Sequence, residues 1–322
     1  MRTIISIAVL LSVAYLYLVY SVSPEWSTLF GFSDAMYLLK NQFIYLLLGF
    51  GIVALVLKLK SPSWFDKIGM FLFGSSIIML FSMFFLPNSL VPVVDEKKLY
   101  IVMGSLHIYP MLFFSLGMLW FTNYVHNSQI AKNFSLIMIG AIFLSGFFAL
   151  SFHDYGMFLL LETVLIFLLF YTNGFSKYFV GSIIGVIVAI AAFIVTAPHR
   201  LSRLQSWLAS SDVVATQNPL DLGSLVLLSK YFGTISLVLI VVFFSFFIYQ
   251  IVKKVSFSEK YRLFNVGVIA TITISLGFNL LNVFGLLPVT PPQLYFFDYG
   301  LSITVVSYLM ISMLSYNNVK HS

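Results

Sequence analysis

The sequence contains no cysteine and few charged residues. Without cysteine, the chain has no disulfide framework, no thiolate nucleophile and no cysteine-ligated metal site. The five histidines show neither H-x-x-x-H nor H-E-x-x-H spacing, so none is expected to bind a metal: His107, His126, His153, His199 and His321. Only 9% of the residues are Asp, Glu, Lys or Arg. A composition so poor in charge excludes a water-soluble domain of 322 residues.

Long apolar runs dominate the chain instead. Hydrophobic residues make up 60% of it, and the mean hydropathy is +1.01. A helix needs roughly 20 apolar residues to cross the hydrocarbon core of a membrane. Ten runs have about this length, near residues 4–22, 42–59, 68–87, 108–125, 134–152, 156–173, 178–197, 225–250, 264–286 and 300–317. The sequence therefore predicts an all-α polytopic membrane protein with about ten transmembrane helices, formed as a single domain over 1–322, with an uncleaved first helix rather than a secretory signal.

Lysine and arginine indicate the orientation, because cytoplasmic loops collect them. With the N-terminus inside, 11 of the 17 basic residues fall in cytoplasmic segments and 6 fall outside. Acidic residues show the opposite bias, with eight outside and two inside. Both termini are therefore predicted to be cytoplasmic. The net charge of +6 reflects this topology, so no nucleic-acid partner is expected.

The segment from Gly285 to Ser302 separates the last two apolar runs and contains three prolines, Pro288, Pro291 and Pro292. Proline cannot continue a helix, so the backbone here is expected to be irregular. At membrane depth, irregular backbone is tolerated only where protein or a water-filled cavity satisfies it. The segment is therefore predicted to line or cap a cavity.

Without gaps, this segment resembles the P-x-T-G-x-x-L-P-F-x-S-Y-G-G-S pattern of the SEDS family of shape, elongation, division and sporulation proteins (FtsW/RodA/SpoVE). The matching positions are Pro288, Thr290, Leu294, Phe296, Tyr299, Gly300 and Ser302, with Asn279 at the family's upstream asparagine. The departures are Pro291 and Leu301 for glycine, Tyr295 for proline and Asp298 for serine. Further similarity follows in order along the chain at Gln42, at Gly104 and Pro110, at Asp154 and Gly156, and from Pro198 to Trp207.

SEDS proteins polymerise lipid II, the undecaprenyl-linked peptidoglycan precursor, so the resemblance implies this substrate class. The family's chemistry relies on an Asp in the fourth outer loop, within W-x-D-P-x-G-x-G-Y-Q, which suits a general base or a metal ligand. Counting from Pro198 without gaps places Val213 there, with Asp212 one residue earlier and the following motif residues absent. Asp212 is therefore the catalytic candidate, and a solvated loop carboxylate is the alternative. A divalent metal is expected only with the enzymatic interpretation, and otherwise no cofactor is expected.

Two arginines open the same loop. Arg200 and Arg203 are three residues apart and would share a helix face. They could hold the phosphates of a lipid head group, or anchor an interfacial segment whose other side carries Leu201 and Leu204. The other candidates for a substrate cavity are Asp154, Glu162, Asn279, Pro288, Thr290 and Tyr299.

Glu162 is the one charged residue deep in a predicted span. A charge there costs on the order of 2.5–3.5 kcal/mol unless it is paired or protonated. We therefore expect it to face a polar interior cavity, either as a proton-relay or substrate-contacting group or as a protonated acid bonded to a neighbouring helix. The intramembrane Glu of the family's Q-P-S-E motif is Leu112 here, and its basic partner is also missing, with Ser115 and Leu116 in that neighbourhood.

Taken together, these features predict a SEDS-like protein of peptidoglycan synthesis, cell division or cell shape in a bacterial cytoplasmic membrane. Because the motif residues are mostly missing, we expect a degenerate member with weak or no polymerase activity. An active lipid II glycosyltransferase with a divergent site and a transporter of lipid-linked precursors are the alternatives. The expected partners are membrane lipid, an undecaprenyl-linked precursor and, from the resemblance, a single-span penicillin-binding protein or another division or elongation protein.

Overall fold

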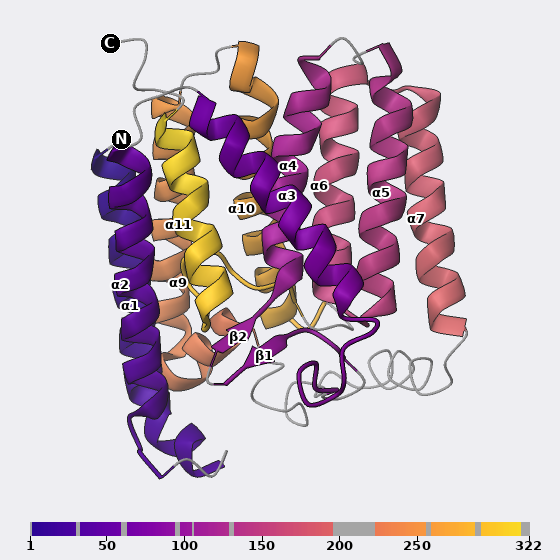
Figure 1. The fold of residues 1–322 in the computed structure, drawn as a ribbon. Coiled ribbons are helices and arrows are strands. Elements are labelled where there is room, and N and C mark those ends of the chain that lie inside the picture. The colour runs from indigo at the N-terminus through magenta and orange to yellow at the C-terminus, as the bar shows by residue number, and fades with distance from the viewer. Residues whose placement is uncertain are drawn as a thin grey trace.

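The computed structural model describes residues 2–29, 33–58, 63–93, 97–104, 106–128, 132–195, 223–255, 259–286 and 291–316. Ten α-helices lie within these residues (Figure 1). They are α1 (Arg2–Leu29), α2 (Tyr37–Lys58), α3 (Ser63–Ser82), α4 (Pro110–His126), α5 (Phe134–Ser151), α6 (Tyr155–Asn173), α7 (Lys177–Val195), α9 (Ser224–Lys254), α10 (Arg262–Val283) and α11 (Leu301–Tyr316). A short 3-10 turn, Glu259–Tyr261, precedes α10.

Each of the ten predicted apolar runs corresponds to one of these helices, so the all-α prediction is confirmed. Seven of the described helices are long and apolar enough to cross a membrane, while α7 and α11 carry shorter apolar stretches, Lys177–Ala191 and Leu301–Leu314. The largest shift in position concerns the third run, 68–87, whose helix spans Ser63–Ser82. This helix ends ahead of Pro87, which cannot continue it and restricts the residue before it.

Local chemistry fixes the starts of α4 and α6. Pro110 occupies the first turn of α4, where a missing N–H costs nothing because that group has no partner within the helix. Asp154 is the N-cap of α6, and its carboxylate accepts a hydrogen bond from the Met157 backbone N–H at 3.2 Å. Capping of this kind satisfies one of the free N–H groups of the first turn.

The helices form one bundle with α4 and α10 near its centre. Helix α4 packs against α3, α10 and α11, whereas α10 also contacts α6 and α9. On one flank α6 is covered by α5 and α7, and on the other α1 packs against α2 and α9 (Figure 1). Helix α9 is kinked at Gly233, which has φ 77° and ψ 177° inside an otherwise helical segment. Glycine adopts this backbone conformation without steric cost.

A small β-hairpin lies between α3 and α4. Strand β1 (Ile101–Met103) pairs antiparallel with β2 (Leu106–Ile108), with Ile101 opposite Ile108. Gly104 in the turn has φ 65°, a conformation that favours glycine. Strands of three residues are too short to leave a clear alternating pattern, so the sequence did not predict them.

The N-terminal end of α1 and the C-terminal end of α11 lie at the same end of the bundle, and the hairpin lies at the opposite end (Figure 1). We call this opposite end, with the 291–300 loop and the first turns of α4, α6 and α11, the hairpin end. An even number of spans returns the chain to the side on which it began. Which end faces the cytoplasm stays a prediction.

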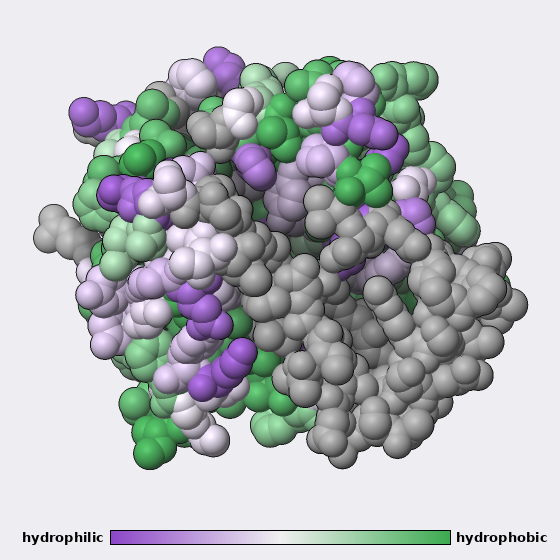
Figure 2. Space-filling model, turned by 90° about the horizontal axis from the view of Figure 1, so that it is seen from below, coloured by the Kyte–Doolittle hydropathy of each residue, from purple (hydrophilic) through white to green (hydrophobic). Residues whose placement is uncertain are grey.

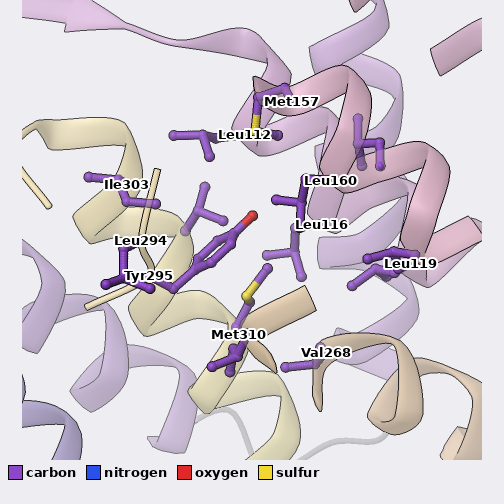
Figure 3. Close-up of a cluster of buried hydrophobic side chains, with 14 of the residues drawn as sticks. Leu112, Leu116, Leu119, Met157, Leu160, Val268, Leu294, Tyr295, Ile303 and Met310 are labelled. Atoms are coloured by element: carbon purple, nitrogen blue, oxygen red, sulfur yellow. The ribbon is translucent and has the colours of Figure 1, made fainter. Parts of the chain in front are cut away.

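The centre of the bundle is filled by hydrophobic side chains. Leu112, Leu116 and Leu160 surround the ring of Tyr295, which reaches in from the 291–300 loop (Figure 3). Leu112 and Tyr295 both have 0% of their surface exposed. The loop thus contributes to the core of the bundle as well as to its surface.

Candidate functional site

Three of the predicted site residues, Asp154, Asn279 and Tyr299, lie at the hairpin end. Seen from below, this end carries hydrophilic side chains among apolar ones (Figure 2). Glu162 lies eight residues after Asp154 on the same helix, about 12 Å deeper at 1.5 Å per residue. The other candidates, Arg200, Arg203, Asp212, Pro288 and Thr290, lie outside the described residues.

Hydrogen bonds from two helices, α10 and α2, hold the 291–300 loop. Asn279 of α10 donates from Nδ2 to the Pro292 carbonyl at 2.8 Å, and Ser275 donates to the Gln293 carbonyl at 2.8 Å. From α2, Gln42 accepts a hydrogen bond from the Gly300 N–H at 3.1 Å. These contacts satisfy backbone N–H and C=O groups of the loop that have no partner in a helix or a sheet. The positions that carry the resemblance therefore brace the loop.

Helix α6 touches the loop directly at Gly156. A Cβ atom at this position would lie 2.9 Å from both the Pro291 carbonyl oxygen and the Pro292 nitrogen. Contacts this short with backbone atoms cannot be relieved by rotating a side chain. The glycine of the Asp154-Tyr-Gly156 sequence is therefore required by the close approach of the loop.

Asp154 is buried between α4 and α6. Its Oδ2 accepts a hydrogen bond from the Tyr109 hydroxyl, and its Oδ1 caps α6. Burial raises the pKa of Asp154 to about 6, although the bonds from Tyr109 and Met157 and the charge of Lys97 lower it. A group of this pKa can exchange a proton near neutral pH. Both of its oxygens are nevertheless engaged by protein donors.

Asp298, a departure from the family pattern, organises the loop from within. Its carboxylate accepts hydrogen bonds from the backbone N–H groups of Leu294, at 3.1 Å, and Tyr299, at 2.8 Å. Burial raises the pKa of Asp298 to about 6, against the lowering effect of these bonds and of the Ser224 hydroxyl. In the sequence, this residue stands out only as a substitution. Aspartate is typical of turns, where its side chain accepts from nearby backbone N–H groups, and this signal could have found it.

Tyr299 packs against α2. Its ring meets that of Tyr45 edge to face, with 6.2 Å between the centroids. Edge-to-face pairs of this kind add packing energy beyond the area they bury. The structure thus places Tyr299 as a contact between the loop and α2.

Glu162 is separate from the loop and is 1% exposed. Its Oε1 accepts a hydrogen bond from Ser145 of α5 at 2.8 Å. It lines a cavity of about 420 Å³ between α5, α6 and α7 whose other walls are mostly apolar. The expectation of a polar cavity is therefore wrong, because Phe, Ile, Val and Ala side chains supply most of the wall.

Within the described residues, no three His, Asp or Glu side chains lie together in a way that could hold a metal ion. Asp154 and Asp298 each bind backbone or hydroxyl donors instead. The absence of a cofactor stays a prediction, because Asp212 falls outside the described residues.

This arrangement of apolar, membrane-length helices around a proline-rich loop defines a polytopic integral membrane protein. The family model of the FtsW/RodA/SpoVE cell cycle proteins matches residues 1–222 and 225–322. The chain belongs to this family, which confirms the resemblance seen in the 285–302 segment.

Similar proteins include two probable peptidoglycan glycosyltransferases FtsW from Helicobacter pylori, of strains 26695 and J99. They are 25% and 24% identical to this chain over 338 aligned positions, which cover 85% of this chain and 86% of each relative. The alignments thus extend over most of both proteins.

Among solved structures, a chain of a peptidoglycan synthase complex matches with a TM-score of 0.76 and 17% identity, covering 100% of this chain and 99% of that one. The rod shape determining protein RodA of Thermus thermophilus matches with a TM-score of 0.70 and 16% identity, covering 100% and 98%. At these identities the likeness shows the fold alone.

Proposed function

We propose that this chain is a membrane protein of peptidoglycan synthesis, acting in cell division or cell shape, whose own polymerase activity is weak or lost. It resides in the bacterial cytoplasmic membrane with both termini in the cytoplasm and the hairpin end outside. Family membership supports a role in peptidoglycan synthesis. The packing of the site supports the loss of polymerase activity.

The packed centre of the bundle is the observation that carries this proposal. Leu112 stands where the resemblance places an intramembrane glutamate, and it is fully buried among apolar side chains (Figure 3). Ser115, one turn later, lies 3.4 Å from the Tyr295 hydroxyl. Removing one partner of a buried ion pair is costly, whereas replacing both by well-packed neutral groups can be neutral or stabilising. The charged pair has thus been exchanged for a packed core.

The acids at the hairpin end support the same conclusion. Asp154 caps α6 and accepts from Tyr109, and Asp298 holds the turn of the 291–300 loop. A general base must lie within reach of a substrate proton, whereas both oxygens of each carboxylate here are held by protein donors. Asp154 instead holds the starts of α4 and α6 together, and Asp298 maintains the shape of the loop.

The fourth outer loop gives the third reason. Asp212 lacks the Pro, Gly-x-Gly and Tyr-Gln that follow the family's aspartate. Glycines at such positions permit positive φ or close approach to a ligand. Without them, an Asp at 212 has lost the backbone context in which the family's residue acts.

An active glycosyltransferase with a divergent site is the second candidate. The hydrogen bonds by which Gln42 and Asn279 hold the 291–300 loop favour this candidate, because they retain the loop on which the family pattern is centred. A transporter of lipid-linked precursors is less favoured. Charged groups facing the interior are expected in transporters, and Glu162 is the one charge deep in a described span.

We further propose three binding partners: membrane lipid, an undecaprenyl-linked precursor and a single-span penicillin-binding protein or another division or elongation protein. The similarity to a chain of a peptidoglycan synthase complex supports the protein partner. The lipid partners follow from the family's substrate class, with Arg200 and Arg203 as the residues to bind phosphate.

Polymerisation of lipid II by the purified protein tests the proposal. The protein is assayed alone and with a single-span penicillin-binding protein, as wild type and as Asp212→Ala, next to an active FtsW or RodA. We expect glycan products at or near background from both forms. In cells, Asp212→Ala should leave any phenotype of the gene intact, while disruption of the 285–302 segment should abolish it. Robust polymerisation that disappears in Asp212→Ala would establish the enzyme instead.

A further inference from the structure

The cavity between α5, α6 and α7 lies apart from the 291–300 loop. Its volume of about 420 Å³ falls within the range of small-molecule sites, roughly 300–1,000 Å³. On the α7 side, Gly181 and Gly185 leave the space open, because a Cβ atom at either position would have no atom within 4 Å. The room therefore comes from missing side chains on α7.

The cavity opens on the apolar surface of the bundle. Phe143 and Phe147 of α5 line it and are 70% and 51% exposed. In a membrane, an apolar helix face of this kind meets hydrocarbon. A ligand would therefore enter from the lipid and must itself be soluble in it.

One carboxyl group interrupts the apolar wall. Glu162 Oε1 accepts from Ser145 at 2.8 Å, whereas its buried Oε2 has no hydrogen-bond partner among the described residues. Leaving a buried polar atom unsatisfied costs about 1–3 kcal/mol. Gly146 brings this carboxyl to the cavity wall, since a Cβ there would lie 3.3 Å from Oε1.

A water molecule is a poor occupant of this space. Buried water needs two to four polar partners. The polar side chains of the wall are Glu162 and Ser182, and the Ser182 hydroxyl already donates to the Tyr178 carbonyl at 2.8 Å. The cavity thus has one polar atom without a hydrogen-bond partner among the described residues, Glu162 Oε2, in a wall that is otherwise mostly apolar.

We propose that this cavity binds an aliphatic molecule that ends in a hydroxyl group, with the hydroxyl on Glu162 Oε2 and the chain between α5, α6 and α7. A hydroxyl both donates and accepts hydrogen bonds, so it satisfies the carboxyl whether or not that group carries a proton. The apolar wall matches the chain. A free long-chain alcohol and a diacylglycerol share this chemistry.

Photolabelling of the full-length protein in lipid nanodiscs tests the proposal. The probe is a C12 alcohol with a diazirine in its chain, and the comparison probe is the corresponding alkane, which neither donates nor accepts a hydrogen bond. We expect the alcohol to label α5, α6 or α7 about five-fold more than the alkane, as one net hydrogen bond of about 1 kcal/mol implies. Competition with 1-dodecanol and with dioleoylglycerol identifies the better natural source.

Three variants locate the labelling. Gly185→Leu should fill the cavity without a clash and abolish labelling, and Glu162→Leu should remove the preference for the alcohol. Gly140→Leu is the matched control, because position 140 on α5 is also open, with no atom within 4 Å, but does not line the cavity. Thermal unfolding of each variant shows whether the fold is retained.

Hydroxyl-dependent labelling that Gly185→Leu removes and Gly140→Leu keeps would support the site. Equal labelling by the alcohol and the alkane would mean that bulk acyl chains fill the cavity, which would overturn the proposal. Labelling by the alcohol that persists in a folded Gly185→Leu variant would overturn it as well.

Discussion

The hydroxyl of Tyr109 donates a hydrogen bond to the buried carboxylate of Asp154, which joins the start of α4 to the start of α6. The backbone N–H of the same tyrosine donates to Ser302 Oγ of α11 at 2.8 Å. One residue therefore connects the first turns of three helices. This connection fixes the geometry of the hairpin end, and its acid makes that end sensitive to pH.

Stability should fall as the pH rises from about 4 to about 6. The pKa of Asp154 is about 6 in the folded protein and about 3.9 when unperturbed. Between these values the folded state binds more protons than the unfolded state, so Asp154 alone lowers the free energy of unfolding by up to about 3 kcal/mol as the pH rises, and the curve levels off above about pH 7. Thermal unfolding in detergent from pH 4 to 7.5 measures this.

Two variants separate the contributing groups. Asp154→Asn should remove part of the slope, and the remainder should come from Asp298, whose pKa is also about 6. Tyr109→Phe removes a hydrogen bond that lowers the pKa of Asp154, so it should move the end of the slope to higher pH. A protein that becomes more stable from pH 4 to pH 6 would contradict the assignment.

Gly156→Ala should destabilise the protein by about 1–3 kcal/mol, the usual cost of overpacking. The added methyl group would press on the backbone of Pro291 and Pro292. Gly140→Ala is the control, because its Cβ meets no atom within 4 Å and alanine favours the helix. Equal melting temperatures for the two variants would mean that the loop does not approach α6 as described.

Glu162→Gln should fold and accumulate normally, because the amide oxygen can still accept the hydrogen bond from Ser145. Glu162→Lys should accumulate poorly, since it places an ammonium group against an apolar wall deep in a span. The amounts of both variants in isolated membranes, measured by immunoblot, check this. Equal accumulation of the lysine variant would show that the site is solvated.

The topology can be read with introduced cysteines, because the natural chain has none. A cysteine in place of Ser210 should react with a membrane-impermeant maleimide from outside, and one in place of Ser258 should react only after the membrane is opened. The 11-to-6 distribution of basic residues motivates this orientation. The reverse labelling pattern would show that the orientation in the membrane is opposite to the predicted one.

The helices could be predicted from composition because a run of apolar residues long enough to cross a membrane has few alternatives. Their ends were less predictable. Helix α2 begins at Tyr37 rather than near residue 42, and α9 continues to Lys254 rather than 250. Aromatic and basic residues at the interface can extend a helix beyond its apolar part, so hydropathy alone underestimates its length.

The contacts of the loop could not be predicted from local patterns. Gln42 and Gly300 are 258 residues apart, and Tyr109 and Asp154 are 45 apart. The family resemblance identified Gln42 and Asn279 as positions of interest without saying what they contact. Asp298 entered only as a departure from the pattern, and the folded arrangement was needed to show Tyr109 as a partner of helix ends and Asp298 as a partner of loop backbone.

The kink at Gly233 also changes how α9 fits a bilayer. A straight helix of its 31 residues would be about 46 Å long, well beyond a hydrocarbon core of about 30 Å. After Gly233, the 21 residues to Lys254 cover about 32 Å, and two lysines end that segment. Before the kink, Leu225 to Leu228 are buried in the protein. Hydrophobic mismatch is thereby avoided without steep tilt or local thickening of the membrane.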